Sequence, residues 1–157
     1  MRKTHLVATL AAALVAAGGS SDAQQKLSAL PAVQVYKTPT CGCCSKWVDH
    51  MRQAGFTVQA QDMSHDELQA VKTKYAVPAA ANSCHTARLG GYIVEGHIPA
   101  DAVKKMLKER PRVVGIAVPG MPIGSPGMEV PGARVQPYDV LSFDKAGATK
   151  VFQTIKP

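Results

Sequence analysis

Three of the four cysteines of this 157-residue chain lie within four positions, in the motif C-G-C-C at 41–44. A short apolar run at 33–36 precedes the motif, and four residues beyond it have the spacing of one helix face: Cys44, Trp47, Val48 and Met51. The cysteines are therefore expected where a strand turns into a helix. A helix start carries unpaired N–H groups and the positive end of the helix dipole, and both stabilise a thiolate.

Three kinds of site are compatible with this motif. Cys41 and Cys44 have the C-x-x-C spacing of a thioredoxin-type redox pair. Cys43 adds a third thiol that a dithiol enzyme does not need, and three thiolates at one helix start favour a soft metal ion, Cu(I) or Zn(II). Structural disulfides are the third alternative, although a bridge between the adjacent Cys43 and Cys44 would be strained.

The order of elements predicts an α/β fold with a thioredoxin-like β-α-β-α-β-β-α domain. The expected elements are a strand at 33–37, a helix ending near Ala54, a strand at 56–62, a helix opened by the capping box at 64–67, a hairpin of 83–88 and 92–95, and a helix from about 98 to 110. Val77-Pro78 is a candidate for the cis-proline of such folds, and a trans bond is the alternative.

A C-terminal extension follows the third helix. An apolar run at 113–118 predicts another strand, and the Pro- and Gly-rich segment 119–132 predicts a loop. Two further strands, at 138–143 and 148–155, predict a closing hairpin. We therefore expect a thioredoxin-like domain at 24–111 and a metal-site extension at 112–157.

The N-terminus has the pattern of a secretory signal peptide at 1–23. Arg2 and Lys3 supply its charged region, the apolar core runs from Leu6 to Ala17, and small residues precede an expected cleavage after Ala23. The apolar core is too short for a membrane anchor, so no membrane insertion is expected after cleavage. The mature protein is expected in the periplasm, an oxidising compartment in which thiols are paired or hold a metal.

The formal net charge of +7 could indicate nucleic-acid binding. However, the basic residues are scattered along the chain, and an exported protein does not normally meet nucleic acid. We interpret the charge as a solvated surface and expect no nucleic-acid partner.

Further soft donors lie far from the motif in sequence. Met121 and Met128 occur in a repeated Pro-Gly-Met of the loop, where no helix face is available to bury them, and a thioether suits Cu(I). The alternative is that each fills an apolar gap. Cys84 opens the hairpin and could approach the motif; a disulfide with one of the three motif cysteines and an inert buried thiol are the alternatives. His97 follows the second strand as a candidate imidazole donor, and a surface or capping histidine is the alternative.

Other candidate donors are weaker. His85, next to Cys84, is a less favoured ligand, whereas His50 and His65 are expected on solvated helix surfaces. Met51 and Met106 have helical core spacing and are expected in the core.

Four segments, in order, carry a resemblance to a known family: C-G-C-C at 41–44, S-C-H-T at 83–86, G-Y-I-V-E-G-H-I-P at 91–99 and P-G-M-P-I-G-S-P-G-M-E at 119–129. Together they resemble the CopG-type copper-resistance proteins over about 33–152. The resemblance implies an exported thioredoxin-like domain whose C-terminal extension helps to hold copper beside the cysteines. It also implies a role in copper tolerance through a change in copper oxidation state.

The first functional hypothesis is a periplasmic copper-binding protein of copper resistance that sequesters copper or interconverts Cu(I) and Cu(II), as a possible copper oxidoreductase. Its expected ligands are Cys41, Cys43, Cys44, Cys84, His97, Met121 and Met128. These thiolates outnumber what one Cu(I) ion needs, so a multinuclear site is physically reasonable. The expected protein is a monomer, with a periplasmic copper-efflux component as a possible partner.

The second hypothesis is a thiol-disulfide oxidoreductase. In that case Cys41 and Cys44 are the catalytic pair, with Cys41 attacking and Cys44 resolving. Cys43, Met121 and Met128 would then be dispensable.

Overall fold

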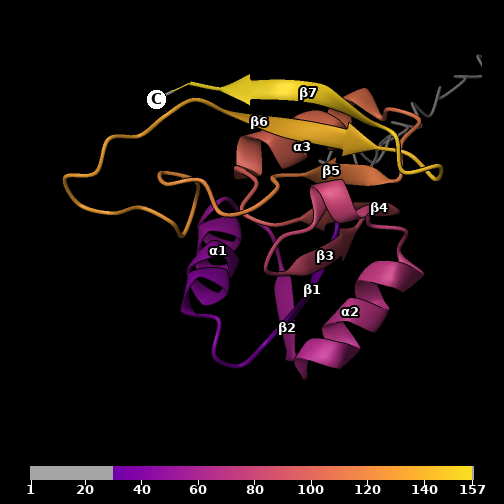
Figure 1. The fold of residues 1–157 in the computed structure, drawn as a ribbon, viewed down its shortest axis with the longest axis horizontal. Helices are drawn as coiled ribbons and strands as arrows, with labels where there is room; N and C mark the ends of the chain where they lie inside the picture. Colours follow the sequence, from indigo (N-terminus) through magenta and orange to yellow (C-terminus); the bar gives the residue numbers. More distant parts are fainter. Residues whose placement is uncertain (1–29, 157) are drawn as a thin grey trace, which may run out of the picture.

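One mixed sheet of seven strands, in the order β2-β1-β3-β4-β5-β6-β7, forms the centre of the computed structural model, which describes residues 30–156 (Figure 1). The strands are β1 Val33–Lys37, β2 Val58–Asp62, β3 Thr86–Leu89, β4 Tyr92–Glu95, β5 Gly115–Ala117, β6 Tyr138–Phe143 and β7 Thr149–Ile155. The helices are α1 Gly42–Gln53, α2 His65–Lys74 and α3 Ala100–Glu109, with a 3-10 turn, η2, at Ala79–Ala81. The expected signal peptide at 1–23 lies outside the described residues.

The order β1-α1-β2-α2-β3-β4-α3 confirms the predicted α/β arrangement. β1 pairs in parallel with β2 and antiparallel with β3, and β3 pairs antiparallel with β4. The C-terminal ends of β1 and β4 therefore share one end of the sheet with the start of β3. Cys41 follows β1, Cys84 precedes β3 and His97 follows β4, so the topology gathers these three residues at that end.

The C-terminal extension continues the same sheet. β5 pairs in parallel with β4, and β6 and β7 add an antiparallel hairpin beside it. The boundary expected between 111 and 112 thus falls between α3 and β5, and the sheet runs across it. The long loop between β5 and β6 passes beside α1 (Figure 1), so the extension returns to the end of the sheet where the cysteines lie.

Helix α1 is held by one buried face. Cys44, Trp47 and Met51 are fully buried on it, as their spacing predicted. The indole N–H of Trp47 donates a 2.8 Å hydrogen bond to the carbonyl oxygen of Ile98, just before α3. Because this bond joins α1 to the segment that follows β4, it helps to fix the cysteine-bearing helix over the sheet. Met106 of α3 is also buried, as expected.

The sequence interpretation differs from the structure in several details. Strands β2 and β5 are shorter than expected, since they begin at Val58 and Gly115. His50 is not a solvated surface residue: its ring is half-buried, and its Nε2 accepts a 3.0 Å hydrogen bond from the backbone N–H of Ala100 at the start of α3. No cis peptide bond occurs within residues 30–156, so the bond between Val77 and Pro78 is trans. None of the helices in this range is long and apolar enough to cross a membrane.

Candidate metal centre

The C-G-C-C motif forms the N-terminus of α1. Cys41 is the N-cap residue without a side-chain cap, and the first turn contains no acidic residue. Cys41 and Cys43 are partly exposed, whereas Cys44 points into the core. The positive end of the helix dipole therefore acts on these sulfurs without competition from a carboxylate in the same turn.

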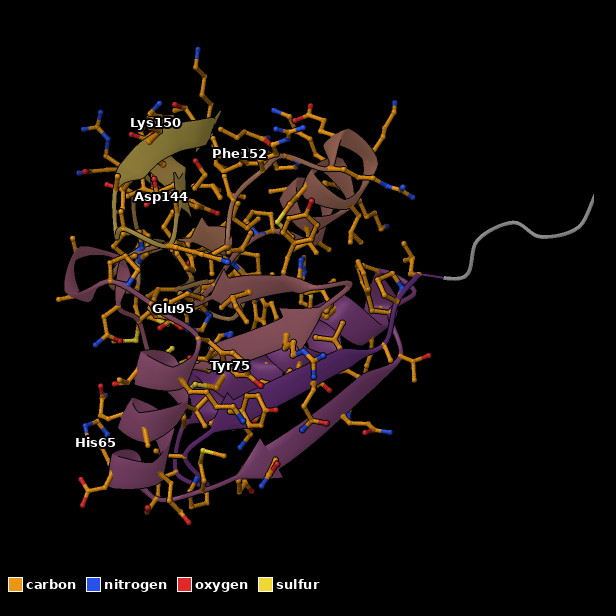
Figure 2. All side chains as sticks on the ribbon, turned by 90° about the vertical axis from the view of Figure 1, so that its right-hand side faces the viewer. His65, Tyr75, Glu95, Asp144, Lys150 and Phe152 are labelled. Atoms are coloured by element: carbon orange, nitrogen blue, oxygen red, sulfur yellow. A yellow bond between two sulfur atoms is a disulfide. The ribbon has the colours of Figure 1, made fainter. Side chains whose placement is uncertain are left out.

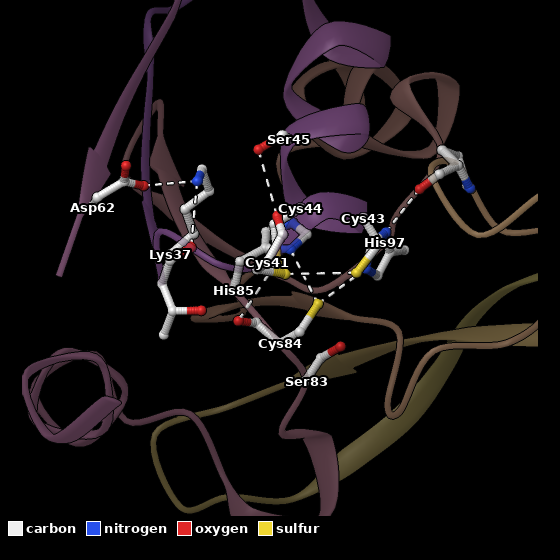
Figure 3. Close-up of a disulfide and its surroundings, with 12 residues drawn as sticks. Lys37, Cys41, Cys43, Cys44, Ser45, Asp62, Ser83, Cys84, His85 and His97 are labelled. Carbon is white, nitrogen blue, oxygen red and sulfur yellow. Dashed lines mark hydrogen bonds and ion pairs between the residues drawn. A yellow bond between two sulfur atoms is a disulfide. The ribbon is translucent and has the colours of Figure 1, made fainter. Parts of the chain in front are cut away.

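A disulfide joins Cys41 and Cys44 in the structure, and Cys43 and Cys84 are free thiols (Figure 3). The Sγ atoms of Cys41 and Cys43 are 3.5 Å apart. The structure thus represents the oxidised form of the C-x-x-C pair. In this form two of the four sulfurs are not available as thiolates.

Cys84 completes a cluster of four cysteine sulfurs. The Sγ atoms of Cys41, Cys43, Cys44 and Cys84 all lie within 4.8 Å of one another, and we call these four residues the sulfur cluster. Burial, and then the neighbouring Cys43, raise the pKa of Cys84 to about 12. Cys84 is therefore a protonated thiol at neutral pH, and a metal ion that bound it would have to displace a proton.

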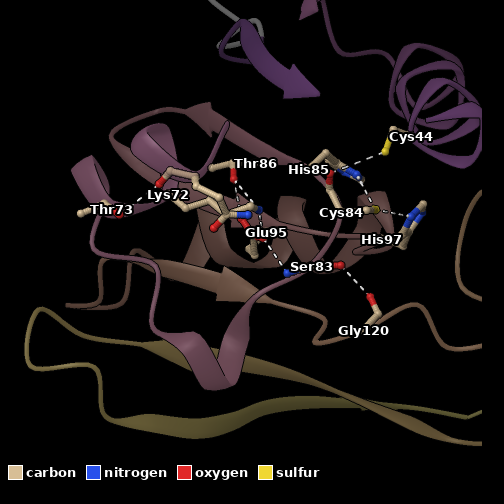
Figure 4. Close-up of polar contacts among 11 residues, drawn as sticks. Cys44, Lys72, Thr73, Ser83, Cys84, His85, Thr86, Glu95, His97 and Gly120 are labelled. Carbon is tan, nitrogen blue, oxygen red and sulfur yellow. Dashed lines mark hydrogen bonds and ion pairs between the residues drawn. The ribbon is translucent and has the colours of Figure 1, made fainter. Parts of the chain in front are cut away.

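His97 lies next to the sulfur cluster and is fully buried. Its Nδ1 is 2.7 Å from the carbonyl oxygen of Pro126. Its Nε2 is 2.9 Å from the Sγ of Cys84, a contact that Figure 4 shows. A carbonyl oxygen only accepts, so Nδ1 must carry the proton and donate it. Burial lowers the pKa of His97, which keeps the ring neutral. The free electron pair of Nε2 therefore faces Cys84.

His85 is a nearer neighbour of the cluster than the sequence indicated. It is fully buried, its Nδ1 lies 3.4 Å from the Sγ of Cys84, and its ring packs against Trp47 at a centroid distance of 4.5 Å. Burial holds the pKa of His85 well below its ordinary value. Its Nε2 has no hydrogen-bond partner among residues 30–156. Cys84, His85 and His97 form a second group whose donor atoms lie within 4.8 Å.

Two hydrogen bonds hold the loop between β5 and β6 beside Cys84, one to the neighbouring Ser83 and one to His97. The Ser83 hydroxyl donates a 2.6 Å hydrogen bond to the carbonyl oxygen of Gly120, and Pro126 receives the bond from His97. Gly127 packs against α1 so closely that a Cβ there would lie 2.6 Å from the carbonyl oxygen of Cys43. Only glycine fits this approach, which explains one glycine of the repeated Pro-Gly-Met.

The two methionines of this loop differ in exposure. Met128 is partly buried and follows Gly127, whereas the side chain of Met121 is 49% exposed. Both belong to the segment that the contacts of Gly120, Pro126 and Gly127 hold beside the sulfur cluster. Copper ligation by either thioether stays a prediction.

A buried ion pair supports the segment that carries Cys84. Glu95 is fully buried and pairs with Lys72, and its Oε1 accepts a 2.8 Å hydrogen bond from the backbone N–H of Ser83 (Figure 4). Its Oε2 accepts a 2.6 Å bond from the Thr86 hydroxyl. Burial raises the pKa of Glu95, and Lys72 and these hydrogen bonds oppose that shift. The sequence showed Lys72 only as one of many scattered lysines, so this pair was not anticipated.

Two solved structures share this fold and much of this sequence. Both are described as copper resistance protein CopG. The first, form 1, is 40% identical, covers 82% of this chain and 99% of its own, and superposes with a TM-score of 0.74. The chain belongs to the CopG family of copper resistance proteins. For CopG form 2 the identity is 41%, the coverage 81% and 99%, and the TM-score 0.72.

The other comparisons add one result. A family model described as a protein of unknown function, DUF411, matches residues 81–128. These residues run from just before Cys84, through His97, to Met128, so they include one cysteine of the sulfur cluster and leave the C-G-C-C motif at 41–44 outside the match. The comparison with curated proteins found no match.

Proposed function

We propose that this CopG-family chain is a periplasmic copper-binding protein of copper resistance that sequesters copper or interconverts Cu(I) and Cu(II). The observation that carries the proposal is the sulfur cluster with the Nε2 of His97 facing it. Two structures described as copper resistance proteins, at 40% and 41% identity, support the choice of metal.

The donor set fits copper on chemical grounds. Thiolate and thioether sulfur are soft ligands that suit Cu(I), and imidazole suits copper in both oxidation states. Cys41, Cys43, Cys44 and Cys84 would supply thiolates and His97 an imidazole nitrogen. Met121 and Met128 are the remaining proposed ligands. With four sulfurs this close, we propose that copper binds as more than one ion per chain, and that thiolates bridge the ions.

The protein's own groups prepare this site in three ways. The carbonyl oxygen of Pro126 fixes the tautomer of His97, so that Nε2 keeps its electron pair for a ligand bond. The apolar surroundings keep His97 and His85 neutral. The start of α1 favours the thiolate forms of the motif. Bound copper would supply one-electron chemistry at this place, and full use of the cluster requires reduction of the Cys41–Cys44 disulfide first.

A second candidate function is supported by that disulfide. Cys41 is partly exposed and Cys44 is buried, which is the arrangement of an attacking and a resolving cysteine in a thiol-disulfide oxidoreductase. In this mechanism a thiolate of Cys41 attacks a substrate disulfide, and Cys44 then displaces the reduced substrate. Cys43, Cys84 and His97 would have no direct role.

One experiment separates the two candidates. Mature wild type, Cys43→Ser and a Ser45→Ala control on the same helix are purified, reduced, loaded with Cu(I) anaerobically and desalted. Elemental analysis then gives copper per chain, and an insulin-reduction assay gives dithiol activity. We expect lower copper content in Cys43→Ser and wild-type content in Ser45→Ala. If Cys43→Ser kept its copper while wild type reduced insulin, the oxidoreductase would replace the copper protein as our conclusion.

The same preparation tests the remaining parts of the proposal. Size-exclusion chromatography checks that the protein is a monomer, and fractionation of cells checks its periplasmic location. A pull-down with and without copper tests whether a copper-efflux component is a partner. Cyclic voltammetry of the loaded protein tests whether the bound copper cycles between its two oxidation states.

A further inference from the structure

The β3–β4 hairpin has a second chemically distinct end, away from the sulfur cluster. Its two strands start from Cys84 and finish at His97, and the turn Gly90–Gly91 closes them at the opposite end. Each strand has four residues, so the turn lies roughly 13 Å along the sheet from the cluster end. Two hollows meet at this turn, and both have Gly91 in their walls.

The first hollow has a volume of about 860 Å³ and lies between the end of α2 and the turn of the β6–β7 hairpin. Figure 1 shows these two segments on the same side of the sheet, and Figure 2 views that side, with Tyr75 and Asp144 labelled. Apolar side chains, including Ile93 and Val114, contribute to its wall. Four cations line it: Lys74, Arg88, Arg112 and Lys145. These four side chains are all exposed.

The second hollow has a volume of about 790 Å³ and lies on the other side of the turn, against α3. Its walls include Leu107 and Tyr92, and three cations line it: Lys104, Lys108 and Arg110. We call the two hollows together the basic groove. Gly91 has no side chain, and a Cβ placed there would meet no atom within 4 Å. The space directly beside Gly91, which lines both hollows, is therefore not filled by other atoms.

The cations of the basic groove are not neutralised within the described part of the chain. Among residues 30–156, the ion pairs are Lys37 with Asp62, Arg52 with Asp49, and Lys72 with Glu95. Asp144 is the one carboxylate lining either hollow, and its Oδ1 accepts the backbone N–H groups of Ala146 and Ala148. The two hollows are thus lined by seven cationic side chains and by one carboxylate, which already accepts two backbone hydrogen bonds.

We infer that the basic groove binds an acidic segment of a partner protein, which crosses the Gly90–Gly91 turn and places an apolar side chain in each hollow. Charge complementarity specifies the acidic character, since carboxylates of the partner would pair with the arginines and lysines of both rims. The apolar walls specify the hydrophobic residues. The division into two hollows that share Gly91 favours an elongated occupant over a compact anion, which would fill only one of them.

This binding site is independent of copper binding. The residues of the groove are not members of the sulfur cluster, and the two regions lie at opposite ends of the same hairpin. A partner held at the groove would leave Cys84 and His97 uncovered. The chain could therefore hold a partner and load or release copper at the same time.

The test uses the mature protein and a fluorescein-labelled peptide of alternating Glu and Leu. Binding is measured by fluorescence anisotropy at low and at physiological salt, and the site is mapped by NMR shift perturbation. The charge-reversal variant Arg88→Glu/Arg112→Glu alters the first hollow. Lys150→Glu/Lys156→Glu makes the same change in net charge at exposed positions of β7 and its end, outside the groove. Copper content of every variant is measured in parallel.

We expect the peptide to shift resonances of both hollows, and Arg88→Glu/Arg112→Glu to weaken binding by about tenfold or more. The Lys150→Glu/Lys156→Glu control should bind within about twofold of wild type, because distant surface charges are screened. All variants should keep wild-type copper content, which separates this inference from the copper proposal.

Four results would overturn the inference. The first is that both charge-reversal variants lose peptide affinity equally, and the second is that the wild type does not bind the peptide even at millimolar concentration. The third is that monomeric N-acetyl-glutamate binds as tightly as the peptide. The fourth is tighter binding to anionic lipid vesicles than to the peptide, which would indicate a membrane surface instead. A Ser-for-Leu peptide that bound as well as the original would remove the apolar part of the argument.

Discussion

The two ends of the β3–β4 hairpin contrast in burial and in charge. At one end Cys84 and His97 are held in a neutral, mostly buried environment, in which His97 is fixed through both of its nitrogens. At the other end Arg88 and Arg112 are exposed and have no ion-pair partner among residues 30–156. The contrast teaches that eight strand residues separate a buried group of soft donor atoms from an exposed cationic surface, so that each of the two proposed sites would have the solvent environment that it needs.

The largest change in the free energy of unfolding is expected at the buried ion pair, which lies between the two ends of the hairpin. Lys72→Met would leave Glu95 buried without its cation, which should cost about 3–5 kcal/mol in the free energy of unfolding. Urea denaturation measures this. Lys74→Met, two residues away and exposed, is the matched control and should change little. A double variant, Lys72→Met/Glu95→Gln, should recover much of the loss; if it did not, the pair would not be the cause.

The same variant has a predictable pH dependence. Burial already raises the pKa of Glu95 in the folded protein, and removal of Lys72 takes away an opposing effect. A folded state that prefers the protonated acid loses stability as the pH rises above the unfolded pKa of about 4.3. Lys72→Met should therefore be less destabilised at pH 5 than at pH 8. An equal loss at both values would contradict this account.

The next effect concerns the sulfur end alone. Cys84→Ser removes the residue that belongs to both groups of donors, and should lower copper affinity by at least about tenfold, or about 1.4 kcal/mol. Competition with a chromogenic Cu(I) chelator measures it. The comparison would be weakened if Cys84→Ser also altered peptide binding at the basic groove, since the two ends would then be coupled.

A smaller effect is expected at His50, which accepts the N–H of Ala100 close to His97. His50→Ala should cost about 1 kcal/mol, as loss of a helix N-cap does. Burial lowers the pKa of His50, although Glu129 and Asp101 oppose the shift and Lys104 adds to it. Its stabilisation is therefore present above the unfolded pKa of about 6.5 and is lost as the pH falls through the folded pKa. His50→Gln keeps an acceptor without a titration, so it should show a smaller loss between pH 7 and pH 5.

The smallest effect is expected at the basic end. Arg88→Glu/Arg112→Glu changes exposed side chains without ion pairs, so the free energy of unfolding should shift by no more than about 0.5 kcal/mol. Thermal unfolding measures it. A large loss of stability would show that these arginines stabilise the fold, which would contradict their description as exposed side chains without ion pairs.

The sequence predicted the fold well because its elements have strong local signals. The capping box of Ser64 and Glu67 opens α2 as expected, and the Gly90–Gly91 pair closes the hairpin. Local patterns could not show what depends on three-dimensional contact. From the sequence, His85 ranks below His97 as a candidate ligand, and only the structure shows that His85 is buried against Trp47 with its Nδ1 3.4 Å from the Sγ of Cys84. The Lys72–Glu95 pair joins α2 to β4 over twenty-three positions, a distance at which no periodicity is informative.

The register of the β3–β4 hairpin determines which residues lie side by side at its open end. Thr86 pairs with Glu95 and Leu89 with Tyr92, so the two strands have equal lengths on either side of the Gly90–Gly91 turn. Deleting one of these two glycines would slip one strand past the other by a single residue and turn its side chains to the opposite face of the sheet. Cys84 and His97 would then cease to be neighbours, although neither had been altered. The glycine turn thus sets the register that brings Cys84 and His97 together at the far end of the strands.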